Sequence, residues 1–437
     1  MLELGPTRKN KVNLAEYNCQ QDIENRMFLA DFSARDREVL EEILFSPLKF
    51  SLKKLARNTG IPEEVIHPIL AKLASAGLLS IEEDAVTVDK EMRKYFECQL
   101  ARFSPDFRPD MEFLQTILRK VPIHLLPSWY AIPRTSNNIF ESIVEKYLLT
   151  PQIYQRYLAE LHFTDARVNG IVQELFAAPD FKISSSDLIV KYNLARKDFE
   201  EIILLLEFYF ICCLTFEQEG DHWTEYVSPF HEWHQYLRFL KETDAPSITK
   251  EVMRQFPSDF AFIEEMTEVL TRQKKPSEGV ALKLCMLGLA EKVGDQIKTL
   301  PTGREWLEMT SENKAIYIYR HPHNQITSVS LPARVATERN IREAERSIKR
   351  VLHGKWVYFD DFLKGVLVPL SEASVVVLKK TGRHWKYTLP TYTEEEKQLL
   401  HAIIFEWLFE TGITAIGTCQ GKECFCVTPF GRFFFED

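Results

Sequence analysis

The sequence lacks a long apolar run, which argues against a membrane-spanning helix. Its longest such run, residues 202–216, contains Glu207 and is shorter than the ~18–20 residues that a bilayer requires. The run predicts instead a buried helix that leads into a strand. The first 26 residues hold no apolar stretch behind their basic residues, so we expect no signal peptide. We therefore expect a cytoplasmic protein with no membrane partner.

Cysteine and net positive charge are also scarce. Eight cysteines among 437 residues are too few for a disulfide scaffold, so we expect reduced thiols. The chain carries 54 basic and 63 acidic residues, for a net charge of −9. A general attraction to nucleic-acid phosphate or to an anionic membrane is excluded by this balance. Any contact with nucleic acid must therefore be local.

Motifs for catalysis are missing from the sequence as well. It contains no GxxxxGK(S/T) phosphate loop, no GxSxG turn and no HExxH pair. The backbone cradle and the lysine that hold nucleotide phosphates are thus absent, and we expect no ATP hydrolysis. We predict a protein that is not an enzyme and has no cofactor. An active site scattered along the chain is a distant third hypothesis.

No metal site is predicted either. The spacing of His222, His231 and His234 matches none of the usual ligand sets, and we expect structural roles for them. Cys424 and Cys426 alternate along an expected strand and so face opposite sides of a sheet. They are poorly placed to share one ion.

What is present favours a string of small folded modules. Hydrophobic residues make up 45% and charged residues 27% of the chain, as in ordinary globular proteins, and the length suggests two to four domains. Helical spacing from Asp36 is followed by a second helix that Gly60 ends as a left-handed cap. Ile61-Pro62 opens a third helix, in which Pro68 predicts a kink or a start nearer Glu64 than Pro62. Two β-prone runs around an acidic turn then predict a hairpin in residues 78–89. Three helices and a hairpin indicate a winged helix.

The same layout returns between Val168 and Glu232. With Ile61 and Leu194 as origins, apolar residues recur at five shared offsets, which predict the core of one helix and of the strand after it. These are Ile66, Ile69, Leu70, Leu73 and Leu78 in the first segment, and Phe199, Ile202, Ile203, Leu206 and Ile211 in the second. The match is one of periodicity more than identity, so it supports a shared fold and leaves a common function open.

Two further modules share a distinct ending. Both contain a helix, a Gly-apolar step at Gly288 or Gly412, a hairpin, and then a Pro-x-Gly-Arg stretch at 301–304 or 429–432. We interpret them as a repeated subtype. The fold class predicted is mainly α with small β-hairpins (α+β), built from tandem winged-helix, or helix-turn-helix plus wing, modules. The expected boundaries are an N-terminal extension 1–30, winged helix 31–104, helical connector 105–165, winged helix 166–245, winged helix 246–330 and C-terminal module 331–437.

The C-terminal module also carries a family resemblance. Its residues are Gly354-Lys355-Trp356-Val357, Phe359-Asp360-Asp361-Phe362, the helix LLHAIIFEWLFETGI and the closing run from Cys426 to Arg432. Over roughly the last hundred residues this pattern resembles the winged-helix domain that precedes the motor in XPB-type helicases, and related TFIIH-like modules. Since the phosphate loop is missing, the resemblance implies a role beside nucleic-acid machinery, as an adaptor or binder, and not strand separation.

The strongest candidate for a binding surface is the basic segment 334–386, which holds twelve basic and six acidic residues. On a helix its first arginines fall on one face, opposite an apolar face that packing would bury. A predicted hairpin follows, with Thr381-Gly382 at its tip, and interleaves charge with Trp385. The candidate nucleic-acid-binding residues are Arg339, Arg342, Arg346, Lys349, Arg350, Lys355, Lys379, Lys380, Arg383 and Lys386. A solvated helix face beside an ordinary wing explains the same pattern equally well.

The third helix of the first module argues against base reading there. Glu63 and Glu64 would stand at the end that usually meets the phosphate backbone and would repel it.

Two hypotheses follow for the whole chain. The first is an adaptor that binds DNA through its basic segment and protein partners of the transcription or repair machinery elsewhere. The second is a pure protein-interaction scaffold that binds no nucleic acid.

Overall fold

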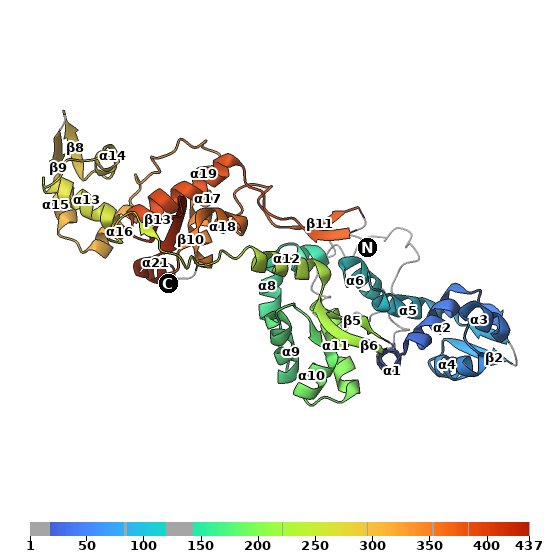
Figure 1. Cartoon of the computed structure of the whole chain (residues 1–437). Coiled ribbons are helices and arrows are strands. Elements are labelled where there is room, and N and C mark those ends of the chain that lie inside the picture. Colours follow the sequence, from blue (N-terminus) through green and yellow to red (C-terminus); the bar gives the residue numbers. More distant parts are fainter. Residues whose placement is uncertain are drawn as a thin grey trace, which may run out of the picture. The chain divides into compact units, whose positions relative to one another are not determined.

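A computed structural model describes residues 18–82, 85–118, 143–220, 222–294, 296–351, 354–382 and 384–436. The chain forms a mixed α+β structure in which small antiparallel sheets accompany many short helices (Figure 1). It divides into two compact units, one of residues 1–236 with 377–387, the other of residues 237–376 with 388–437. Within the described part of the chain, no helix has the length and apolar character needed to span a membrane.

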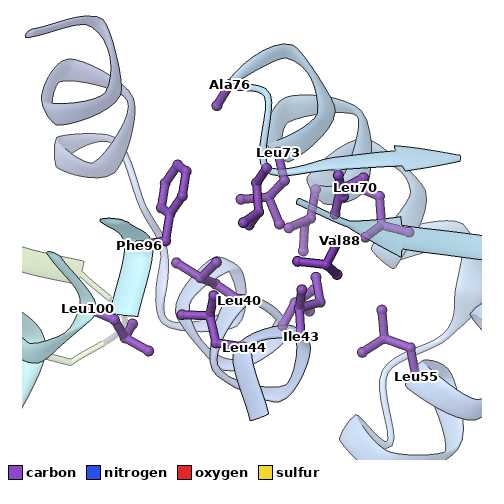
Figure 2. Packing of buried hydrophobic residues seen from close by; sticks show 14 of the residues in the cluster. Leu40, Ile43, Leu44, Leu55, Leu70, Leu73, Ala76, Val88, Phe96 and Leu100 are labelled. Carbon is purple, nitrogen blue, oxygen red and sulfur yellow. The ribbon is translucent and has the colours of Figure 1, made fainter. Parts of the chain in front are cut away.

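The first half of unit 1 combines five α-helices with a three-stranded sheet of order β1-β3-β2. Its elements are α1 (Cys19–Ala30), α2 (Ala34–Phe45), β1 (Lys49–Ser51), α3 (Leu52–Thr59), α4 (Glu63–Ser75), β2 (Leu79–Glu82), β3 (Ala85–Val88), α5 (Lys90–Leu100) and η2 (Ala101–Phe103). Ser33 and Asp36 form a capping box that starts α2, and Gly60 ends α3 at φ 70°, as the sequence predicts. Leu40, Ile43 and Leu70 lie in one buried cluster between these helices (Figure 2).

The second half of unit 1 repeats this order with a sheet β4-β6-β5. After α6 (Met111–Leu118), η5 (Val144–Leu148) and α8 (Pro151–Glu160) come α9 (Ala166–Ala177), β4 (Ile183–Ser184), α10 (Ser185–Lys191), α11 (Arg196–Phe208), β5 (Cys212–Glu219) and β6 (His222–Pro229). Helix α12 (His231–Glu242) follows and crosses the division between the units. The apolar run 202–216 is therefore a buried helix entering a strand, as predicted.

Unit 2 holds two further helix-and-hairpin segments. The first consists of β7 (Met253–Arg254), α13 (Ala261–Leu270), α14 (Glu278–Met286), β8 (Ala290–Val293), β9 (Gln296–Thr299), α15 (Pro301–Leu307) and α16 (Ser311–Arg320). The second consists of α17 (Glu338–Ser347), η6 (Ile348–Arg350), β10 (Val357–Tyr358), α18 (Phe359–Lys364), α19 (Glu394–Ala402), η7 (Ile403–Trp407), α20 (Leu408–Glu410), β13 (Thr414–Cys419), β14 (Lys422–Val427) and α21 (Pro429–Glu436). Their shared sheet has the order β10-β14-β13-β7.

All ten residues at the shared offsets of the first two segments are buried, none of them more than 7% exposed. Helices α4 and α11, which carry most of these residues, each span 13 residues. The periodicity therefore predicts the core of both helices correctly.

A left-handed residue ends the helix before the hairpin in all four segments. These residues are Gly77 (φ 76°), Phe210 (φ 59°), Gly288 (φ 64°) and Gly412 (φ 72°). The next N–H in each case donates to the carbonyl five residues back, from Leu78 to Leu73, Ile211 to Leu206, Leu289 to Leu284 and Ile413 to Leu408. This six-to-one bond is the Schellman cap, which satisfies the last carbonyls of a helix. The repeat is thus one of backbone geometry, even though phenylalanine replaces glycine in the second segment.

The subtype shared by the last two segments also has a physical cause. A Cβ at Gly303 would lie 2.2 Å from the carbonyl oxygen of Leu289, and one at Gly431 would lie 2.2 Å from that of Ile413. A side chain at either position would collide with the backbone at the start of the hairpin. The glycine of each Pro-x-Gly-Arg stretch is therefore required by close packing of the last helix.

A buried ionic network joins the two halves of unit 1. Glu207 on α11 accepts from Arg102 at 2.6 Å and from Arg26 at 2.9 Å, and all three side chains are at most 4% exposed. The Nε of Arg26 also donates to Glu200 at 3.0 Å, and Glu200 pairs with Arg196. The predicted N-terminal extension 1–30 thus contributes a helix and a buried cation to the fold.

We expect acid to weaken this network. Burial acts to raise the pKa of Glu207, but the guanidinium groups of Arg102 and Arg26 outweigh it and lower the pKa to about 2. Since the folded pKa lies below the ordinary value of 4.5, the contribution to stability is complete above about pH 4.5 and is lost as the pH falls toward 2. Urea denaturation of unit 1 can be monitored by hydrogen exchange of its amides. The midpoint urea concentration should fall between pH 5 and pH 3. An unchanged midpoint over that range would contradict this assignment.

Candidate nucleic-acid interface

The predicted basic hairpin is present as β11 (Leu378–Thr381) and β12 (His384–Tyr387). Four residue pairs are in antiparallel register, with Leu378 opposite Tyr387 and Lys380 opposite Trp385. Gly382, at φ 64°, supplies the left-handed conformation that a tight hairpin turn requires. Arg383 lies outside the described residues.

The hairpin packs against unit 1 through its base. The N–H of Leu378 donates to the carbonyl of Leu149 at 2.7 Å, and the hydroxyl of Tyr387 donates to that of Leu148 at 2.8 Å. The ring of Tyr387 also lies beside Trp233 and Tyr236. Although the sequence places this hairpin inside the segment 331–437, it groups with the first unit.

The outer part of the hairpin presents three exposed lysines, Lys379, Lys380 and Lys386. Lys379 stands directly opposite Lys386 in the register, so two like charges occupy one cross-strand pair. Across the described residues, no carboxylate lies within ion-pair distance of these three lysines, whereas nearby His384 lies 4.0 Å from Asp110. Two unneutralised ammonium groups on neighbouring strands favour a shared anionic ligand.

The basic face of α17 is largely balanced by its own acids. Arg339, Arg342 and Arg346 are exposed, as predicted. However, Arg342 pairs with Glu338 one turn away, and Arg346 lies 3.3 Å from Glu343. Such exposed pairs within one helix are typical of a solvated face. The helix offers less free positive charge than its arginine count implies.

The last two basic residues of this run depart from the helical pattern. The chain changes from α-helix to the 3₁₀ turn η6 at Ile348, so Lys349 and Arg350 no longer continue the α-helical face. Lys349 remains exposed, 5.9 Å from the ring centre of Phe435. Arg350 turns inward, and its guanidinium packs close to Gly365. A Cβ on that glycine would lie 2.5 Å from the guanidinium. The placement of Arg350 on the exposed basic face was therefore wrong.

Lys355 is exposed and lies two residues before β10, which leads directly into α18. The predicted site residues are thus divided between the two units. Those of α17, η6 and the following loop belong to unit 2, while Lys379, Lys380 and Lys386 belong to unit 1. The sequence suggested a single patch because these residues lie close together along the chain. In the structure, however, the hairpin is an insertion between α18 and α19.

Helix α4 has the acidic leading end that argues against base reading. Glu63 and Glu64 occupy its first turn and His67 is exposed beyond them. The preceding helix α3 exposes Lys54 and Arg57. The first segment therefore combines an acidic third helix with a basic second one.

A cavity of about 450 Å³ in unit 1 was not predicted from the sequence. It lies between β5, β6 and the stretch that follows η2, and Trp223, Arg108, Lys182 and His234 are among its lining residues. The sequence predicts structural roles for His231 and His234, and both line this cavity together with Trp223. His222, His231 and His234 are not among the described groups of possible metal ligands that converge.

No protein-family model and no curated protein sequence matches the chain.

Proposed function

We propose that the chain is a non-catalytic tandem winged-helix adaptor that binds nucleic-acid phosphate through the hairpin β11–β12. The observation that carries this proposal is the exposed cross-strand pair of Lys379 and Lys386, with Lys380 beside it and no acidic partner among the described residues. A resemblance to the winged-helix domain of XPB-type helicases remains part of the proposal, as does a role beside transcription or repair machinery.

The order of elements supports the winged-helix assignment. In the first two segments a short strand follows α2 or α9 and pairs with the second strand of the hairpin, giving the sheets β1-β3-β2 and β4-β6-β5. The fourth segment places β10 next to β14 in the same manner. The hairpin β11–β12 is separate from these wings and forms its own two-stranded sheet. A basic hairpin can reach phosphates without reading bases, and phosphate contacts set position and not sequence identity.

A pure protein scaffold is the second candidate. The chain's net charge of −9 and the ion pairs of α17 favour it. The side chain of Phe45, 74% exposed at the end of α2, is the kind of apolar surface that protein partners cover. The two candidates differ in whether the hairpin lysines meet phosphate.

Charge reversal of the hairpin should abolish nucleic-acid binding without unfolding. We expect the triple variant Lys379→Glu, Lys380→Glu and Lys386→Glu to lose at least about tenfold in affinity for duplex DNA at 50 mM salt. The slope of log affinity against log salt concentration should fall by about 3, since each phosphate contact contributes about 0.9. Fluorescence anisotropy with short duplexes of different sequence measures both quantities, and little preference among sequences is expected.

The matched control is the triple variant Lys275→Glu, Lys292→Glu and Lys298→Glu, which makes the same charge change around the exposed hairpin β8–β9. This control should bind like the parent. If both triples weaken binding equally, only net charge matters and the hairpin is not the site. If the parent shows no salt-sensitive affinity for DNA or RNA, the scaffold candidate stands in place of the adaptor.

A further inference from the structure

The start of α6 and the tip of the hairpin β11–β12 bring three possible metal ligands together. One ligand atom each from Asp110, Glu112 and His384 lies within 4.8 Å of the other two, and no other such group occurs in the part of the chain that the structure describes. Asp110 precedes α6, Glu112 lies in its first turn, and His384 begins β12. Two segments far apart in the sequence therefore meet at this point.

One carboxylate oxygen of Asp110 and the imidazole of His384 are placed to bind an ion. One carboxylate oxygen of Asp110 caps α6 by accepting the N–H of Phe113 at 2.9 Å. The other lies 4.0 Å from Nδ1 of His384, which is too far for a hydrogen bond. An ion that binds an oxygen and a nitrogen at about 2.0–2.1 Å each brings such atoms to roughly 3.3 Å in a tetrahedral site. The His384 side chain is 77% exposed, so it can close this gap by a small rotation.

The buried carboxyl group of Glu232 contacts the backbone between the two acidic ligands. Glu232 is 1% exposed, and its Oε1 accepts the N–H of Met111, the residue between Asp110 and Glu112. Its Oε2 is buried and has no hydrogen-bond partner among the described residues. This side chain fixes the backbone that carries both acidic ligands, as outer groups do at metal sites.

We propose that Asp110, Glu112 and His384 bind one divalent ion of the zinc class, with water completing the coordination. A ligand set of one imidazole and two carboxylates suits zinc and similar transition metals, whereas magnesium and calcium favour oxygen ligands alone. The bound ion links the hairpin β11–β12 to α6 within unit 1. This site does not depend on nucleic-acid binding, since all three ligands are separate from the three lysines.

Equilibrium dialysis of the full chain against Zn²⁺ and Co²⁺ tests the site. The parent should bind one equivalent more than His384→Ala, and one more than Asp110→Asn. Asparagine is the preferred second variant because it keeps the helix cap while removing the anionic ligand. His67→Ala, which removes an exposed histidine of α4, is the matched control and should retain the parent's stoichiometry.

Two further measurements make the result decisive. Hydrogen exchange of the β11–β12 amides should slow at least about threefold on addition of Zn²⁺ in the parent and in His67→Ala, and not in His384→Ala. A visible absorption band of bound Co²⁺ that His384→Ala removes would report the imidazole directly. Equal stoichiometry in the parent and His384→Ala overturns the site, and so does displacement of Zn²⁺ by equimolar Mg²⁺.

Discussion

Glu207→Gln is expected to destabilise unit 1 by about 3–5 kcal/mol, the usual cost of breaking a buried ion pair by removing one partner. Glutamine keeps the shape of the side chain, so the loss is one of charge and not of volume. The variant should expose α11 and β5 to hydrogen exchange at urea concentrations where the parent is still protected. Among single polar changes, this one should have the largest effect.

The expected cost follows from what Glu207 holds. Its two oxygens contact the guanidinium groups of Arg26 and Arg102, and Oε1 also accepts the backbone N–H of Leu214 at 3.2 Å. The two arginines are at most 4% exposed, so neither can turn to water when the carboxylate is lost. When the negative charge of Glu207 is removed, the two buried guanidinium groups are left with Glu200 as the remaining carboxylate of the network.

Glu97→Gln is the matched control for this result. Glu97 accepts from Arg93 at 2.9 Å on the surface of α5, where both side chains are partly or well exposed. Exposed pairs of this kind contribute about 0.3–0.5 kcal/mol. If Glu207→Gln costs no more than Glu97→Gln, the buried network does not hold the two halves of unit 1 together.

Local patterns in the sequence predict local structure well. The spacing of apolar residues identifies α4, α11 and their hairpins because burial of one helical face imposes that spacing. Gly60 and the glycine of each Pro-x-Gly-Arg stretch mark backbone positions that other residues cannot easily occupy. These signals depend on only a few neighbouring residues, so they can be recognised in the sequence without knowledge of the tertiary fold.

Contacts between distant segments could not be predicted in this way. The sequence showed Glu207 inside an apolar run but gave no sign that Arg26 and Arg102 would reach it. It placed Lys379 beside the arginines of α17, although the hairpin is inserted between two helices and joins the first unit. The meeting of Asp110 with His384 likewise depends on where that insertion docks.

The last prediction tests the repeat itself. Ile203→Asp is expected to unfold the second half of unit 1, because Ile203 is fully buried at the offset that Leu70 occupies in the first half. An unpaired carboxylate in such a core costs several kcal/mol, which approaches the ~5–15 kcal/mol that stabilises a whole domain. Hydrogen exchange should show early loss of protection in α9 to β6.

Val190→Asp makes the same type of change on neighbouring α10, where Val190 is 79% exposed, and should behave like the parent. Because both variants add one negative charge to the same segment, only burial separates them. A parent-like Ile203→Asp would show that the shared offsets do not mark a common core.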